Sequence, residues 1–154
     1  MNPHDLVELD RLNMSPIIER AGGRFVPGFR LAKLREEIDS GAEFITLERQ
    51  DQLVAYLEFL PEPDGICKIL SLQIHPDWQR TSLLRTLLRL ALDRLKSASP
   101  SFRLIRSAAH VVNPTSLSLH EKLGFTATTR TPDRIEYQIP PTTHLLTRLH
   151  SILH

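Results

Sequence analysis

The sequence predicts a single α/β domain, α+β in its arrangement, whose central unit spans residues 66–139. The chain has 154 residues, which is long enough to bury one hydrophobic core and leaves no room for a second. Apolar residues follow a helical spacing in residues 1–42 and a period of two from residue 43 onward. A strand pattern, a long helix pattern and a second strand pattern then follow one another in residues 66–112.

Three short helices are expected in the N-terminal segment, each bounded by turn residues. They span residues 3–12, 16–20 and 29–39. Ser15 is the expected N-cap of the second helix, and Gly22 and Gly23 stop it. Gly41 stops the third helix in the same way.

Strands dominate the rest of the domain. The expected strands cover residues 44–47, 53–60, 66–74, 102–112, 125–129 and 134–139. The first two alternate around a polar turn and predict an antiparallel hairpin, and the last two predict another across Pro132 and Asp133. The strand at 66–74 has apolar residues on both faces, which is typical of a central strand.

Two helices are interleaved with these strands. The pattern at 81–96 is the longest, with leucines along one face and charged side chains along the other. The second helix opens with Asn113 as N-cap and Pro114 at the first helical position, and Gly124 ends it.

Composition and charge exclude several classes of protein. The formal net charge is +1, so no overall basic field favours nonspecific nucleic-acid binding. The lone Cys67 cannot form an internal disulfide or a cysteine-based zinc site. The N-terminus lacks the basic and apolar regions of a signal peptide, and no apolar run approaches the roughly 20 residues that cross a membrane. We therefore expect a cytoplasmic protein with no membrane partner.

The tail after Pro141 has two features of its own, and it is expected to form a short amphipathic helix over residues 143–153. His150 and His154 have the spacing of a metal-binding pair, but no third ligand accompanies them, so a solvated tail and no metal are expected. The tail leucines fit no predicted core element, and they either cover a sheet edge or pair with a second subunit in a homodimer. They are Leu145, Leu146, Leu149 and Leu153.

The turn between the strand at 66–74 and the helix at 81–96 is the expected centre of function. The first N–H groups of a helix have no intrahelical acceptor, and together with the helix dipole they attract an anion. Many α/β proteins leave such a turn empty. The turn alone therefore does not assign a ligand.

Two segments resemble a known family. Residues 75–79 read His-Pro-Asp-Trp-Gln, and residues 113–125 read Asn-Pro-Thr-Ser-Leu-Ser-Leu-His-Glu-Lys-Leu-Gly-Phe. Together with the order of elements over residues 43–139, they resemble the GNAT superfamily of acyl-CoA-dependent N-acetyltransferases. In that family the corresponding helix ends in Leu-Tyr-Glu-Lys-Leu-Gly-Phe, and His120 stands in the place of its Tyr.

This resemblance implies a mixed, mostly antiparallel central sheet flanked by helices, in one domain over residues 1–154. Residues 1–42 would form the acceptor side, residues 43–139 the sheet and cofactor-binding core, and residues 140–154 a C-terminal tail. The implied donor is acetyl-CoA or another acyl-CoA, the implied partner is an amine-bearing acceptor, and no metal takes part. The implied reaction transfers acetyl to a primary amine by direct attack on the thioester.

The resemblance also implies which residues hold the donor. The main-chain groups that would bind the pantetheine arm belong to Leu72, Gln73 and Ile74, and a main-chain N–H among them would polarise the thioester carbonyl. The pyrophosphate cradle would be formed by Gln79, Arg80, Thr81, Ser82, Leu83, Leu84 and Arg85. Asn113 and Ser116 would face the cofactor from the following helix, and His120 would lie near the thioester sulfur.

Two side chains are candidates for the proton transfers. About a quarter of an unperturbed imidazole is protonated at pH 7, so His120 is the candidate acid for the leaving thiolate, with a packed or exposed helix histidine as the alternative. The strand at 66–74 carries no acid, and Glu58 on the neighbouring strand is the candidate base, acting through a water. His75 and His110 are alternatives to Glu58, and an acceptor amine of low pKa needs no base.

The turn departs from the family pattern at the places of three glycines, where Arg80, Ser82 and Leu84 stand. Glycine is favoured at such places because it lets the main chain approach a phosphate. This departure motivates an alternative function, a non-catalytic GNAT-like module that acts as a regulatory or interaction protein. A third hypothesis, nucleic-acid binding through the arginines of residues 80–94, is disfavoured because acidic residues offset them and no aromatic residues interleave.

Overall fold

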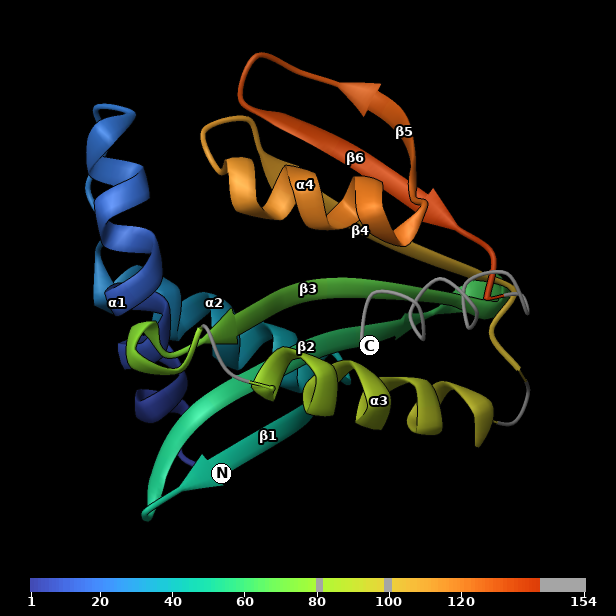
Figure 1. Cartoon of the computed structure of the whole chain (residues 1–154), viewed down its shortest axis with the longest axis horizontal. Helices are drawn as coiled ribbons and strands as arrows, with labels where there is room; N and C mark the ends of the chain where they lie inside the picture. The colour runs from blue at the N-terminus through green and yellow to red at the C-terminus, as the bar shows by residue number, and fades with distance from the viewer. Residues whose placement is uncertain (80–81, 99–100, 142–154) are drawn as a thin grey trace.

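Six strands form one sheet in the order β1-β2-β3-β4-β6-β5 in the computed structural model, which describes residues 1–79, 82–98 and 101–141 (Figure 1). The strands are β1 (Glu43–Arg49), β2 (Gln52–Glu62), β3 (Ile66–Ile74), β4 (Leu104–His110), β5 (Thr126–Arg130) and β6 (Arg134–Ile139). Every neighbouring pair is antiparallel except β3 with β4, which is parallel. The predicted fold class, with a mixed and mostly antiparallel sheet, is confirmed.

The parallel pair β3 and β4 is joined over a short distance only. Ile66, Cys67 and Lys68 pair with Leu104, Ile105 and Arg106. The rest of β3 pairs with β2 alone, and β4 continues beside β6. The two strands therefore separate toward their carboxyl ends, as Figure 1 shows. This separation leaves one main-chain edge of β3 without a strand partner in the described part of the sheet.

Helices cover both faces of the sheet. They are α1 (Pro3–Arg20), α2 (Pro27–Asp39), α3 (Leu83–Lys96) and α4 (Pro114–Leu123). Two single-turn 3-10 helices, η1 (Pro63–Gly65) and η2 (Pro76–Trp78), flank β3. The first two helices pack against Tyr56, whereas α3 packs against Leu57, its neighbour on β2. Because successive side chains of a strand point to opposite faces, α1 and α2 lie behind the sheet and α3 lies in front of it.

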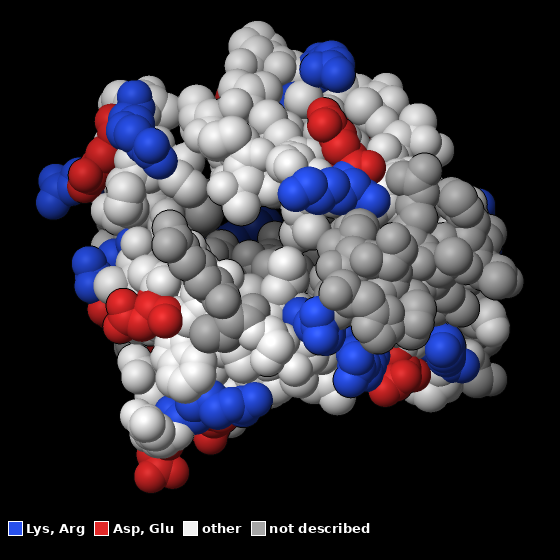
Figure 2. All heavy atoms as spheres, in the orientation of Figure 1, with Lys and Arg blue, Asp and Glu red and all other residues white. Residues whose placement is uncertain are grey.

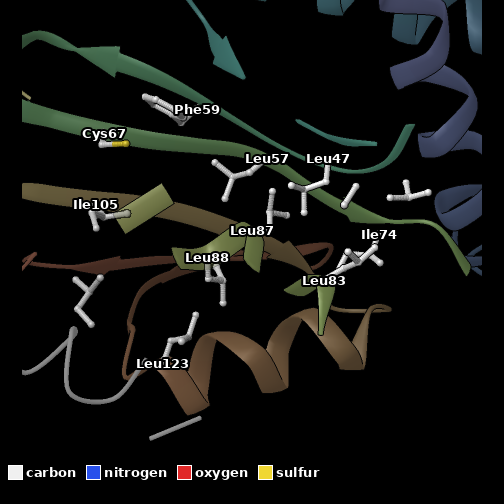
Figure 3. Close-up of a cluster of buried hydrophobic side chains, with 13 residues drawn as sticks. Leu47, Leu57, Phe59, Cys67, Ile74, Leu83, Leu87, Leu88, Ile105 and Leu123 are labelled. Atoms are coloured by element: carbon white, nitrogen blue, oxygen red, sulfur yellow. The ribbon is translucent and has the colours of Figure 1, made fainter. Parts of the chain in front are cut away.

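The main core lies between α3 and the strands (Figure 3). Leu87 and Leu88 from the predicted leucine face of α3 are buried, and so is Leu83. Leu87 has no exposed surface, and burying one leucine side chain contributes about 1.5–3 kcal/mol. Cys67 is also fully buried in this core, and burial raises the pKa of its thiol to about 12. Cys67 is therefore a small packed residue of the core, because a protonated, buried thiol is a poor nucleophile.

The N-terminal helices differ from the sequence prediction. A single helix, α1, replaces the two expected at 3–12 and 16–20, and Pro16 lies inside it. Proline removes one hydrogen bond and costs about 3 kcal/mol in a helix interior, which is why the sequence suggested a break. Residues on both sides of Pro16 are hydrogen-bonded within the continuous helix: Ser15 Oγ donates to Glu19 Oε1 at 3.2 Å, and Asn13 Nδ2 donates to the Ile74 carbonyl at the end of β3.

Other boundaries differ by a few residues. The expected helix at 29–39 begins at Pro27, and the expected strand at 102–112 is shortened to β4. Helix α3 begins at Leu83, and Thr81, where this helix was expected to start, lies outside the described residues together with Arg80. Pro100 and the predicted tail helix, with its leucines and histidines, lie outside them as well.

Candidate active site

The space between β3 and β4 forms a cavity of about 710 Å³. Figure 2 shows this face of the molecule hollowed near its centre. One wall is apolar and comes from α3, through Leu84, Leu88, Ala91, Leu92 and Leu95. A second wall, called the polar wall, comes from α4 and its N-cap, with the polar residues Asn113, Thr115, Ser116 and His120 beside the apolar Leu119 and Leu123. A mostly apolar cleft with a few convergent polar groups is the usual form of a small-molecule site.

The end of β3 supplies the cavity with main-chain groups. Leu72, Gln73 and Ile74 all line it, as do the other residues from Ile69 onward. Their pairing partner is β2 on one side only, so the opposite main-chain edge faces the cavity. An unpaired strand edge presents N–H and C=O groups that a bound ligand can satisfy.

Helix α1 is joined to this strand end through Asn13. Asn13 Nδ2 donates to the Ile74 carbonyl at 2.8 Å and to Gln73 Oε1 at 2.9 Å. Gln79 Nε2 donates to Asn13 Oδ1 at 3.1 Å and to the same Ile74 carbonyl at 3.2 Å. The Gln79 side chain therefore links the turn to Asn13 and to the end of β3 instead of pointing to solvent. The Ile74 carbonyl already accepts hydrogen bonds from Asn13 and Gln79 within the protein.

The start of α3 shows how the turn is built without glycine. Ser82 is the N-cap residue, yet its side chain makes no capping hydrogen bond. Leu83 packs into the core, whereas Leu84 lines the cavity and Arg85 is half-buried. The first turn of α3 carries no acidic side chain of its own, so none of its residues offsets the positive end of the helix dipole.

Helix α4 begins as the sequence predicted. Asn113 Oδ1 accepts from the Ser116 N–H at 3.2 Å, Pro114 occupies the first turn, and Gly124 ends the helix with a φ of 87°. Asn113 and Ser116 both line the cavity. The cap fixes the direction in which α4 faces β4, and with it the position of His120 two turns later.

His120 is held rigidly at the polar wall. Its Nδ1 lies 2.7 Å from the Ser116 carbonyl, and its Nε2 lies 2.8 Å from Ser107 Oγ on β4. The ring stacks on Tyr137 with centroids 4.4 Å apart and meets the edge of Phe125 at 5.2 Å. Two hydrogen bonds and two aromatic contacts leave the ring one orientation.

These contacts also assign the tautomer of His120. A carbonyl can only accept, so Nδ1 carries the proton and donates it to Ser116. Nε2 of the neutral ring then accepts from the Ser107 hydroxyl. Burial lowers the pKa of the imidazole below its ordinary 6.5. The protonated share at pH 7 is therefore smaller than the quarter expected for an unperturbed histidine.

A buried charged cluster lies behind the sheet, at the end of the cavity nearest α1. Arg30 bonds three carboxylates: Nε lies 2.5 Å from Asp10, Nη1 2.7 Å from Glu37 and Nη2 3.1 Å from Glu58. The Tyr56 hydroxyl donates to Asp10 and lies 3.1 Å from Ser71 Oγ. Asp10, Arg30 and Ser71 line the cavity. Three carboxylates surround one guanidinium, so this end of the cavity favours positive charge.

Glu58 is the member of this cluster whose pKa lies near neutral pH. Its side chain is fully buried, and Oε2 has no hydrogen-bond partner among the described residues. Burial, together with the neighbouring Glu37 carboxylate, raises its pKa to about 7. Glu58 lies opposite Ser71 in the β2–β3 register, one strand away from the cavity. A carboxylate with this pKa is matched to proton transfer at neutral pH.

Several residues of this site were not predicted from the sequence. Ser107 and Asn13 contact the predicted residues His120 and Gln79 across long stretches of chain, and no local pattern connects them. Asp10 offered a signal, because it is an acid on the buried face of α1.

The two alternative bases that the sequence suggested lie in different places. His110 lines the cavity, whereas His75 Nδ1 accepts from the Asp77 N–H in the turn.

Comparison with known proteins adds a family and a fold. The model of the acetyltransferase (GNAT) family matches residues 13–125. No curated protein matches the sequence.

None of the helices in the described ranges is both long and apolar enough to cross a membrane. Among the same residues, no group of three or more His, Cys, Asp or Glu side chains is arranged to hold a metal ion.

Solved structures share the fold at low sequence identity. A GNAT-family protein from Desulfovibrio desulfuricans is 18% identical, with a TM-score of 0.68 over 92% of this chain and 95% of that chain. The PaiA N-acetyltransferase from Thermoplasma acidophilum, in complex with coenzyme A, is 16% identical, with a TM-score of 0.71 over 90% and 92%. YncA from Salmonella typhimurium, with its cofactor acetyl-CoA, is 19% identical, with a TM-score of 0.63 over 92% and 91%.

Proposed function

The chain belongs to the GNAT family of acetyltransferases, and we propose that it is an acyl-CoA-dependent N-acyltransferase that transfers acetyl to a primary amine. The observation that supports this proposal most strongly is the cavity at the separation of β3 and β4. It combines an unpaired strand edge, the start of a helix and a buried histidine in one cleft. Similar structures hold coenzyme A or acetyl-CoA, which supports an acyl-CoA donor here.

The donor is proposed to lie along the cavity with its pantetheine arm against β3. Main-chain groups of Leu72 and Gln73 would bind the arm, because the Ile74 carbonyl is occupied by Asn13 and Gln79. The pyrophosphate would lie at the start of α3, where the positive end of the helix dipole attracts an anion and the first turn carries no acidic side chain. Arg80, Thr81, Ser82 and Arg85 are the proposed contributors of charge and hydroxyl groups. Asn113 and Ser116 would contact the donor from α4.

The acceptor is proposed to enter from the side of α1 and α2. The carboxylates around Arg30 favour a positively charged amine at that end of the cavity. Glu58 is the proposed base. It would take the proton of the amine through a water molecule in the part of the cavity that Ser71, its partner in the β2–β3 register, lines. The neutral amine then attacks the thioester carbonyl, whose oxygen is stabilised by a main-chain N–H of the Leu72 to Ile74 segment.

The leaving thiolate is proposed to receive its proton from His120 by way of Ser107. In the protonated ring Nε2–H donates to Ser107 Oγ, and the hydroxyl hydrogen of Ser107 is then free to point into the cavity. The lowered pKa makes the imidazolium a stronger acid, although less of it is present at neutral pH. In this arrangement Ser107 and His120 would take the proton-donating role of the tyrosine hydroxyl that the family pattern has at this position.

One observation supports a second function. The side chain of Leu84 lines the cavity at a place where the family pattern has glycine. A non-catalytic module that keeps the fold and serves as a regulatory or interaction protein would tolerate that bulk. We place either form of the protein in the cytoplasm, because its buried free Cys67 suits a reducing compartment.

Calorimetric titration with acetyl-CoA separates the two functions. The wild-type protein should bind, and Ser82→Trp should weaken binding at least tenfold by blocking the start of α3. Ser97→Trp is the matched control, because Ser97 is an exposed residue at the opposite end of the same helix. Absence of binding by the wild type at millimolar acetyl-CoA would exclude the enzyme. Binding unchanged by Ser82→Trp would show that the pyrophosphate lies elsewhere.

A further inference from the structure

Ser107 and His120 are arranged as a nucleophile and its base. Ser107 Oγ lies 2.8 Å from Nε2, within the reach that such a pair requires. The opposite ring nitrogen donates to the Ser116 carbonyl at 2.7 Å, which fixes the tautomer with a lone pair on Nε2. In this arrangement the carbonyl occupies the orienting place that a carboxylate holds in a catalytic triad.

The pair faces the cavity and is rigid. Ser107 and His120 both line the cleft that also holds the end of β3. The ring is fixed between Tyr137, stacked at 4.4 Å, and Phe125, whose ring meets it edge-on. Ser107 is itself anchored in β4 opposite Tyr137 of β6. A nucleophile and base held by strands and packed rings keep their geometry before any ligand arrives.

We propose that Ser107 is an acyl acceptor activated by His120, and that the protein hydrolyses acyl-CoA through an acyl-serine when no amine is bound. This inference rests on the proposed use of acyl-CoA as donor. Ser107 and His120 would then give the same cavity two outcomes, transfer to an amine when one is present and slow hydrolysis when it is absent.

The steps balance with acyl-CoA and water alone. Ser107 Oγ attacks the thioester carbonyl carbon, and its proton passes to His120 Nε2. The C–S bond breaks as the Oγ–C ester forms, and Nε2–H protonates the leaving sulfur to give the free thiol. Water then attacks the ester and gives a proton to Nε2, which returns it to Ser107 Oγ as the carboxylic acid leaves.

The test compares wild-type protein with Ser107→Ala, His120→Gln and a control, Ser118→Ala. Ser118 lies on α4 and is not among the residues that line the cavity. Each protein is incubated without amine, either with acetyl-CoA or with para-nitrophenyl acetate, an activated ester that needs no CoA site. Acid-quenched samples are analysed by intact and peptide mass spectrometry, and release of thiol or nitrophenol is followed in parallel.

The wild type and Ser118→Ala should carry one acetyl group on Ser107 and release product at equal rates. Ser107→Ala and His120→Gln should release product roughly a hundredfold more slowly. The inference is overturned if no acetyl-Ser107 forms with either probe and Ser107→Ala releases product at the wild-type rate. If acetyl-CoA nevertheless binds by calorimetry, only the acyl-serine fails and the proposed transferase stands. If acetyl-CoA does not bind, the transferase fails, and the ester probe alone decides whether Ser107 is a nucleophile.

Discussion

Replacement of Glu58 by Gln should make the protein more stable at alkaline pH. The side chain is fully buried, Oε2 accepts no hydrogen bond from the part of the chain that the structure describes, and the carboxyl shares Arg30 with Asp10 and Glu37. Burial raises its pKa from the ordinary 4.5 to about 7. A carboxyl whose folded pKa is raised binds more protons in the folded state, so its effect on stability is unfavourable once the pH exceeds the unfolded value.

The size of the effect follows from the two pKa values. The gap between 4.5 and about 7 corresponds to roughly 3 kcal/mol, because each pKa unit equals about 1.4 kcal/mol. Below pH 4 the group is protonated in both states and costs nothing. Between pH 4.5 and 7 the wild type progressively loses this free energy of unfolding, and above pH 7 the loss is complete. Gln cannot ionise and avoids the loss.

Urea denaturation at pH 5 and pH 8 measures this difference. Relative to the wild type, Glu58→Gln should gain roughly 2–3 kcal/mol of unfolding free energy between the two pH values. Glu48→Gln, an exposed glutamate on β1, should behave as the wild type does. The explanation is wrong if Glu58→Gln and the wild type keep the same difference in stability at both pH values.

Three further changes test other parts of the structure. Leu87→Ala should lower the free energy of unfolding by about 2–5 kcal/mol in urea denaturation, because Leu87 is fully buried in the main core. Asn13→Ala should lower it by about 1–3 kcal/mol and weaken acetyl-CoA binding in calorimetry, because the Ile74 carbonyl loses a partner at 2.8 Å. His120→Phe should keep the packing against Tyr137 and the affinity for acetyl-CoA while slowing turnover, because the bond to Ser107 is lost.

Each of these predictions has an outcome that contradicts it. A loss below 1 kcal/mol for Leu87→Ala would show that the core relaxes around the missing side chain. Unchanged acetyl-CoA affinity for Asn13→Ala would mean that the contact between α1 and β3 does not shape the donor site. An unaltered turnover number for His120→Phe would remove His120 from the reaction.

Much of the fold could be predicted from the sequence because its signals are local. The bounds of β3 match the predicted strand at 66–74, where apolar residues occupy both faces. The bounds of α4 match as well, because Asn113, Pro114 and Gly124 act through neighbouring main-chain groups. The cavity was not predicted, because it depends on the separation of β3 and β4 after three paired residues, which the order of the elements does not reveal.

The parts that could not be predicted depend on contacts between distant residues. Helix α1 continues through Pro16 because tertiary contacts outweigh one lost hydrogen bond, and propensity alone suggests a break. The tautomer of His120 depends on Ser107, which belongs to another strand. The raised pKa of Glu58 depends on burial and on the carboxylate of Glu37 in α2, and neither is visible along β2.

The central claim is that acyl-CoA occupies the cavity between β3 and β4. A crystal structure of the protein with coenzyme A tests it most directly. The pantetheine arm should lie along Leu72 and Gln73, the sulfur near Ser107, and the pyrophosphate at the start of α3. Coenzyme A bound at another surface, or an empty cavity in crystals grown at saturating coenzyme A, would contradict the claim.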